Sequence, residues 1–281
     1  MDILTIGLGT IGTTYSYLFN KAGHNVEHYI RKSSKKINIT ELNVDMLDGR
    51  NNKKGDHYTD TYKVNTHTKD NYDFIFISMP AGNIESVIET LNSNNIKGTI
   101  ILCCGIWEDK KYLEKIMQGR EYILGYPVAG GNIVDTLTCC IFDHFILEKK
   151  ENSKIDNYDK LVKLFESCNI KLETPYDMLE WIWLHMAINA GVVSIAAKYA
   201  DIDNPTEAAE NLMSSSKLLA EAVCAIRETS KIIKARGVNL KHYRNELWGY
   251  KLPIFVSAPI MKRMFATNIL TRKIMTLHNN T

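Results

Sequence analysis

Three glycines near the start of the chain have the spacing that suits a phosphate-binding turn. Gly7, Gly9 and Gly12 follow the pattern G-x-G-x-x-G. The first glycine allows a tight turn, the second lets the backbone approach a pyrophosphate, and the third lets a helix pack closely on the preceding strand. The N-terminus of that helix offers unpaired N–H groups to the anion. We therefore predict that these glycines, with Thr10 and Ile11 between them, bind a dinucleotide. The alternative is a purely structural glycine turn.

Basic residues stand where the chain is expected to meet the adenosine ribose. Arg31 and Lys32 follow the second predicted strand, and Lys35 and Lys36 come shortly after. An acidic residue at this point would hold the 2′-hydroxyl of NAD, whereas an arginine suits the 2′-phosphate of NADP. Arginine can also grip a phosphate through two parallel hydrogen bonds. We predict NADP as cofactor, bound by Arg31 and Lys32. A solvated basic loop and an NAD enzyme are the alternatives.

One histidine and one asparagine are candidates for chemistry on a carbonyl group. His185 and Asn189 are four residues apart in a segment with helical spacing, so they share one helix face. Histidine can pass a proton near neutral pH, and an asparagine amide can orient a carbonyl or carboxylate. Reduction of C=O needs a hydride from a cofactor and a proton from such a side chain. The competing interpretation is that His185 satisfies a buried hydrogen bond in a tryptophan-rich helix.

The elements that must position these residues alternate in type over the first half. Strands are predicted at 2–6, 24–30, 72–78, 98–104 and 121–127, and helices at 13–22, 84–91 and 156–168. Two β-like runs are predicted at 37–46 and 61–66, with an exposed polar loop at 48–60 between them. Two antiparallel strands at 136–142 and 144–149 are expected to close the sheet edge, and a short strand is predicted at 170–172. Alternating strands and helices indicate a parallel sheet with right-handed crossovers.

Ligands in such sheets bind beyond the carboxyl ends of the strands. Met79 and Pro80 follow one predicted strand, and Cys104 ends the next. We therefore predict that these three residues line the nicotinamide side of the cofactor site. The predicted fold class is an α/β Rossmann-type nucleotide-binding domain at 1–175, followed by an all-α domain at 176–281 that binds substrate and forms dimers.

The second half contains no strand signal. Helices are predicted at 177–199, at 206–236, where Gly237 ends the helix, and at 254–277. No internal repeat interrupts either half. The composition is that of a globular protein, with 45% hydrophobic and 23% charged residues.

Composition and charge exclude several classes of partner. The formal net charge of +2 is too small to indicate binding to nucleic acid or to an acidic membrane. We expect no membrane-spanning run and no signal peptide, because the chain starts directly on a strand. The six cysteines show neither a disulfide framework nor metal-ligand spacing, so no metal site is predicted and a cytoplasmic location is expected.

Together these motifs resemble the ketopantoate reductase (2-dehydropantoate 2-reductase) family. The resemblance rests on IGLGTIGTTYSYLFNKAGHNV with Arg31 after it, on YDFIFISMPAGNIESVIETL, and on LEWIWLHMAINAGVVSIAA. It covers most of the chain and implies a Rossmann domain followed by a helical domain. It also implies NADPH-dependent reduction of a 2-oxo acid to a 2-hydroxy acid.

The chain departs from the family pattern at several positions. Pro80 stands where the family usually has a lysine, and Cys104 where it has an asparagine. The catalytic lysine of the family aligns with His185, while the asparagine one turn later is retained as Asn189. The late segment with a serine and a glutamate is not recognisable. A histidine proton donor also resembles the opine dehydrogenases.

The expected function is therefore NADPH-dependent reduction of a small 2-oxo acid or related carbonyl compound. His185 would donate the proton and Asn189 would orient the substrate. Two alternatives stay open: an opine-dehydrogenase-like reductive condensation with an amine, and an NADP-binding sensor or regulatory protein without catalysis. A homodimer is a further possibility that the resemblance suggests.

Overall fold

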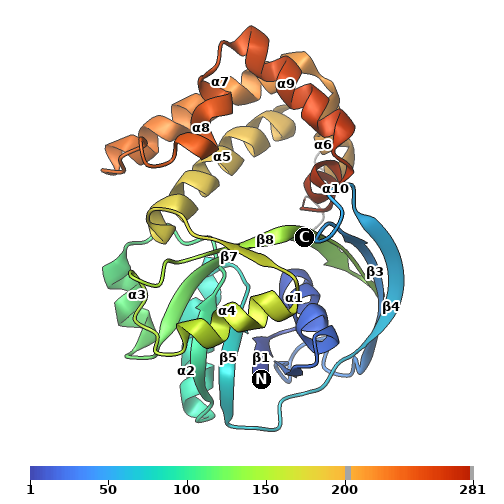
Figure 1. Ribbon diagram of the computed structural model, residues 1–281, viewed down its shortest axis with the longest axis vertical. Helices are drawn as coiled ribbons and strands as arrows, with labels where there is room; N and C mark the ends of the chain where they lie inside the picture. Colours follow the sequence, from blue (N-terminus) through green and yellow to red (C-terminus); the bar gives the residue numbers. More distant parts are fainter. Residues whose placement is uncertain (200–203, 279–281) are drawn as a thin grey trace. The chain divides into compact units, whose positions relative to one another are not determined.

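The computed structural model describes residues 1–199 and 204–278. Contacts between Cα atoms divide the chain into two compact units, Met1–Leu179 and Glu180–Thr281. The first unit contains a sheet with helices packed on it, and the described part of the second contains helices only (Figure 1). The predicted fold class, a Rossmann-type domain followed by an all-α region, is confirmed.

The first unit is built on a sheet that runs β2-β1-β5-β6-β7-β8-β3-β4, with β9 paired to β8. The strands from β2 to β7 in this order are parallel to their neighbours, and β8 is parallel to β3 and β9. Two pairs are antiparallel: β7 with β8, and β3 with β4. The strands are β1 Asp2–Ile6, β2 Asn25–Tyr29, β3 Glu41–Asp48, β4 Asp56–Lys63, β5 Asn71–Ile77, β6 Lys97–Leu102, β7 Tyr122–Ile133, β8 Thr136–Leu147 and β9 Lys171–Glu173.

The helices of this unit are α1 Thr10–Lys21, α2 Ile84–Ser93, α3 Lys110–Met117 and α4 Tyr158–Ser167, with a 3-10 turn η1 at Ala81–Asn83. α1 and α4 share one apolar core with one face of the sheet. The ring of Tyr15 on α1 stacks on that of Phe76 of β5, with 5.4 Å between the ring centroids. The ring centroids of Phe165 on α4 and Phe145 on β8 are 4.5 Å apart. Because strand residues alternate between faces, Ile75 and Ile77 of β5 are buried on the other side.

Several boundaries in the first unit differ from the predictions. The predicted loop at 48–60 is shorter in the structure, since β3 ends at Asp48 and β4 begins at Asp56, and these two residues pair with each other. β4 lies at the sheet edge, where polar side chains can face solvent, and this explains its loop-like composition. The two predicted strands at 136–149 are the single strand β8, and it does not close the edge because β3 and β4 follow it. Helix α3 was not predicted.

The helices of the second unit are α5 Met178–Lys198, which begins at the unit boundary, α6 Pro205–Ser214, α7 Ser216–Ala235, α8 Arg244–Lys251, α9 Ile254–Thr267 and α10 Ile269–His278. Two predicted helices are each divided. Ser215 ends α6 and caps α7 by accepting a hydrogen bond from Leu218 N at 3.3 Å. Asn268 separates α9 from α10, and its side chain accepts from Thr271 N at 3.0 Å. These side-chain caps compete with a continuous helix. Helix α8 was also not predicted.

Helix α5 is long and apolar enough to cross a membrane by length and composition alone, which the sequence analysis did not expect. The core helix of a globular protein meets the same criterion. Gly191 of α5 is packed so closely that an added Cβ would lie 2.8 Å from the backbone nitrogen of Ile226 on α7. Helix α5 is therefore packed closely on α7 at this point.

Candidate functional site

The glycine turn joins β1 to α1 with the geometry that its sequence predicts. Gly7 has a φ of +80°, a conformation that favours glycine, and its N–H donates to Tyr29 O at 2.8 Å. Gly9 is the N-cap of α1 in an extended conformation, without a side-chain cap. A Cβ added at Gly7 or Gly9 would meet nothing within 4 Å. The turn therefore leaves open space in front of the first N–H groups of α1, where an anion can bind.

Gly12 allows the close approach of α1 to the sheet. An added Cβ would lie 2.9 Å from Cγ2 of Thr5 in β1, closer than carbon atoms tolerate. Next to this contact, the hydroxyl groups of Thr5 and Ser16 are hydrogen-bonded at 2.6 Å. Because α1 begins at Thr10 rather than at 13, Thr10, Ile11 and Gly12 form the first turn of the helix.

A buried histidine contacts the backbone of the glycine turn and supports it. His28 of β2 is 0% exposed, with Nδ1 2.9 Å from Gly7 O and Nε2 2.8 Å from the hydroxyl of Tyr62. A carbonyl only accepts, so Nδ1 carries the proton and Nε2 accepts from Tyr62. Burial lowers the pKa of His28 to about 4, which keeps the ring neutral. Nothing in the strand pattern marks His28, so its role could not be predicted from the sequence.

A cavity of about 400 Å³ opens beside the glycine turn, entirely within the first unit. Its residues come from the glycine turn, from the segment after β2, and from the segment after β5 with α2. They are Ile6, Gly7, Leu8, Gly9, Tyr29, Ile30, Arg31, Ser34, Lys36, Ser78, Met79, Pro80, Asn83, Ser86, Val87, Thr90 and Leu91. This is the carboxyl end of adjacent parallel strands, where α/β sheets bind ligands.

The cavity has an apolar part and a basic part. Ile30, Val87 and Leu91 line its apolar part, where Val87 is half-buried and the other two are buried. Arg31, Ser34 and Lys36 provide two cations and a hydroxyl group. With the turn of Gly7 and Gly9, the cavity thus combines an apolar slot with two places that attract phosphate.

The structure brings some of the predicted cofactor residues together and separates others. Gly7, Gly9, Arg31, Met79 and Pro80 all line the cavity. Lys32 is exposed and does not line it, whereas Ser34 and Lys36, which the prediction left out, do. Spacing alone could not distinguish Lys32 from Lys36, because the fold of the loop decides which lysine turns inward.

Cys104 does not line the cavity. It is 1% exposed, and burial raises the pKa of its thiol to about 11. A thiol in such surroundings stays protonated and unreactive at neutral pH. The position after β6 therefore carries a buried thiol, whereas the family usually has an asparagine there.

The two predicted catalytic residues lie on α5, in the second unit. The ring of His185 stacks on Trp181, with 4.9 Å between ring centroids and 13° between their planes. Asn189 is exposed one turn later. The N-terminal part of α5 is held by Glu180, whose carboxylate accepts from the hydroxyl of Tyr243 at 2.7 Å. His185 is half-buried, so its orientation is restricted while part of the ring stays accessible.

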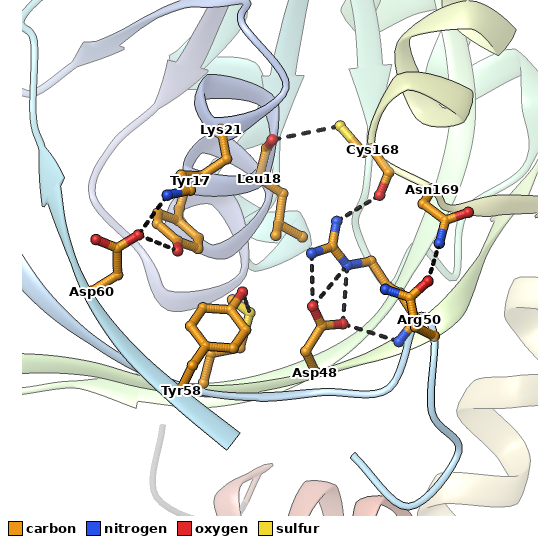
Figure 2. Close-up of polar contacts among 11 residues, drawn as sticks. Tyr17, Leu18, Lys21, Asp48, Arg50, Tyr58, Asp60, Cys168 and Asn169 are labelled. Atoms are coloured by element: carbon orange, nitrogen blue, oxygen red, sulfur yellow. Dashed lines mark hydrogen bonds and ion pairs between the residues drawn. The ribbon is translucent and has the colours of Figure 1, made fainter. Parts of the chain in front are cut away.

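A polar cluster holds α1, the helix that carries the glycine turn, against the far end of the sheet (Figure 2). Tyr17 and Lys21 of α1 both donate to the Asp60 carboxylate of β4 at 2.8 Å. The Arg50 guanidinium binds both carboxylate oxygens of Asp48 and donates to the carbonyl of Cys168 at 2.5 Å.

In the same cluster, the Cys168 thiol lies 3.6 Å from Leu18 O on α1. The contacts connect the β3–β4 hairpin, α1 and the end of α4. They place the helix axis and hence the direction in which its N-terminus points.

The parallel strand order and the glycine turn between β1 and α1 are those of a Rossmann-type domain. Residues 3–127 match the family model "Ketopantoate reductase PanE/ApbA". The predicted resemblance to the ketopantoate reductase family is thereby confirmed over this part of the chain.

Solved structures share the fold at low sequence identity. The ternary structure of D-mandelate dehydrogenase with NADH and anilino(oxo)acetate is 15% identical with a TM-score of 0.64, over 99% of this chain and 83% of that one. A PanE/ApbA family ketopantoate reductase from Ralstonia eutropha is 13% identical with a TM-score of 0.62, over 100% and 97%. A dimeric ketopantoate reductase from Staphylococcus aureus is 13% identical with a TM-score of 0.60, over 95% and 80%. No curated protein matches the sequence.

Proposed function

We propose that the protein is an NADPH-dependent oxidoreductase that reduces a small 2-oxo acid or a related carbonyl compound. The observation that carries the proposal is the cavity itself, in which the open glycine turn, an apolar slot and a basic loop lie together. These are the features that hold the diphosphate, adenine and 2′-phosphate of a dinucleotide. The names of the similar proteins, ketopantoate reductase and D-mandelate dehydrogenase, support a substrate of the 2-oxo acid class.

In this proposal the chain binds the cofactor and supplies the proton. Gly7 and Gly9 with the first turn of α1 hold the diphosphate, and Arg31 faces the adenosine ribose. When bound, the cofactor supplies a hydride to the carbonyl carbon. His185 donates the proton to the carbonyl oxygen, and Asn189 orients the substrate by hydrogen bonding. Stacking on Trp181 fixes the His185 ring in one plane, which favours a defined direction of proton transfer.

A consumption assay tests the proposal. Oxidation of NADPH would be followed with a panel of 2-oxo acids, each with and without amino acids. Turnover with a 2-oxo acid alone supports the reductase. Turnover only when an amine is present would assign the reductive condensation of an opine dehydrogenase instead.

A non-catalytic NADP sensor is the second candidate, and a specific observation favours it. The segments after β5 and β6 present Pro80 and a buried Cys104 rather than a lysine and an asparagine. Neither can donate a proton at neutral pH or neutralise a developing charge. Binding of NADPH without turnover across the panel would decide for the sensor.

We further propose a homodimer and a cytoplasmic location. The second unit exposes Phe255, Ile260 and Met264 on α9, with Phe255 80% exposed, which is apolar surface that a second copy could cover. A structural relative is described as dimeric. All six cysteines are free thiols, as a reducing compartment favours.

A further inference from the structure

Lys36 connects the basic loop to the glycine turn. Its Nζ donates to the carbonyl of Leu8 at 2.9 Å, and Leu8 stands between the two glycines that line the cavity. The lysine side chain is half-buried, and it lines the same cavity as Arg31 and Ser34. One cation thus contacts the backbone of the phosphate-binding turn and faces the place where the adenosine ribose would lie.

Short-range hydrogen bonds in the loop explain why Lys36 turns inward. Ser34 N donates to Arg31 O at 2.9 Å, and Ile37 N donates to Ser34 O at 3.2 Å. Lys36 N also donates to the hydroxyl of Ser34 at 3.2 Å. The chain therefore reverses direction after Arg31 and returns Lys36 to the cavity, while Lys32 and Lys35 stay exposed.

The ammonium group of Lys36 has N–H groups that its hydrogen bond to Leu8 O does not use. It carries three N–H bonds, and the hydrogen bond to Leu8 O uses one of them. Over residues 1–199 and 204–278, neither Lys36 nor the guanidinium of Arg31 forms an ion pair. Burial lowers the pKa of Lys36, which means that its charge is poorly solvated. Two cations beside one cavity, without a carboxylate between them, form a site that gains stability when an anion binds.

We infer that Lys36 is the specificity-determining residue of the cavity: it binds the 2′-phosphate of NADPH together with Arg31 and Ser34, and it holds the glycine turn through Leu8. The inference rests on the proposed function, since it names the residue that selects between NADPH and NADH. A compact ammonium serves a phosphate as a point charge, while Arg31 supplies the flat guanidinium that can also stack on a base. NADH lacks the 2′-phosphate, so Lys36 would affect NADH binding only through its hydrogen bond to Leu8 O, which holds the glycine turn.

The experiment measures dissociation constants for NADPH and NADH by calorimetry with the wild-type chain and with Lys36→Met. Loss of a charge-assisted hydrogen bond to phosphate is expected to weaken NADPH by about 10- to 100-fold. NADH is expected to weaken by less than about 5-fold, because only the support of the turn is lost. Lys36→Arg should retain most of the preference for NADPH. Lys32→Met and Lys35→Met, on the same loop but exposed, are matched controls and should change neither constant by more than about 3-fold.

Each other outcome overturns a defined part of the account. Equal weakening of both nucleotides by Lys36→Met would limit Lys36 to holding the turn. Unchanged constants would remove it from the site altogether, while NADPH binding by the wild type would keep the proposed function intact. If the wild type bound neither nucleotide, the proposed function would fail first. Should Lys36→Met not fold, adenosine 2′,5′-bisphosphate and 5′-AMP are titrated against the wild type and Lys36→Arg to test the preference for the 2′-phosphate: equal affinities of the two ligands for the wild type would overturn the inference.

Discussion

The Nδ1 of His28 lies 2.9 Å from the carbonyl oxygen of Gly7, so a neutral, buried imidazole supports the glycine turn. Its other nitrogen accepts from Tyr62 at 2.8 Å, which ties the turn to the β3–β4 hairpin. Protonation of this ring would place a charge among buried groups and would abolish the bond from Tyr62.

The stability of the protein should therefore depend on pH through His28. Burial lowers the pKa of His28 from 6.5 to about 4 in the folded state, so between these values the unfolded chain binds more protons. The stabilisation is complete above about pH 6.5 and is lost as the pH falls, by about 1.4 kcal/mol per unit and about 3 kcal/mol at pH 4. The free energy of unfolding in urea, measured from pH 7 to pH 4, reports this loss.

A matched variant isolates the contribution of His28. Glu148, whose pKa burial raises to about 7, contributes the opposite slope in the same range. The comparison is therefore between the wild type and His28→Gln, which lacks the titrating ring. The difference in unfolding free energy between the two should shrink as the pH falls, and a difference that stays constant would contradict the assignment.

The contact between Gly12 and Thr5 predicts a compensating pair of substitutions. Gly12→Ala places a Cβ 2.9 Å from Thr5 Cγ2 and should cost about 1–3 kcal/mol of stability, because α1 must move away from the sheet. Thr5→Ser removes that methyl group but keeps the hydroxyl bonded to Ser16. The double variant should recover more than half of the loss in thermal or chemical unfolding. Strictly additive effects would show that the methyl group is not the obstacle.

The buried ion pair at the back of α1 should matter more than the exposed one. The Arg50 and Asp48 side chains are 16% and 9% exposed, so Arg50→Met leaves a buried carboxylate unpaired and should cost about 3–5 kcal/mol. Lys21→Met breaks an exposed pair with Asp60 and should cost less than about 1 kcal/mol. Urea unfolding of the two variants gives the comparison. Similar losses would contradict the assignment of the larger stabilisation to the buried pair.

His185 should affect turnover rather than cofactor binding. His185→Ala removes the proposed proton donor and is expected to lower kcat by about 10²- to 10⁴-fold, while the dissociation constant for NADPH changes less than about 3-fold. His185→Gln keeps a hydrogen-bonding group of similar size and serves as the control for packing on Trp181. Single-turnover kinetics with the best substrate separate the chemical step from product release. Full activity in either variant would remove His185 from the mechanism.

Some features of the site could be predicted from local sequence and others could not. The turn at Gly7 and Gly9 was predictable because strand, turn and helix are adjacent in the chain. Lys36 was not, since its inward direction depends on hydrogen bonds within a loop that has no periodic pattern. The breaks at Ser215 and Asn268 depend on one side-chain cap each, inside segments that keep their apolar spacing. Strand β4 reads as a loop because an edge strand carries polar residues.

The most direct test of the central claim uses Gly9. Its φ of −83° suits any L-residue, and a Cβ there meets nothing within 4 Å, so Gly9→Val should fold with a thermal midpoint close to that of the wild type. The valine side chain would occupy the space assigned to the diphosphate, and the affinity for NADPH in calorimetry should fall by at least about 100-fold. Wild-type affinity in a folded Gly9→Val variant would contradict the account, because the glycine turn could then not be the place where the nucleotide binds.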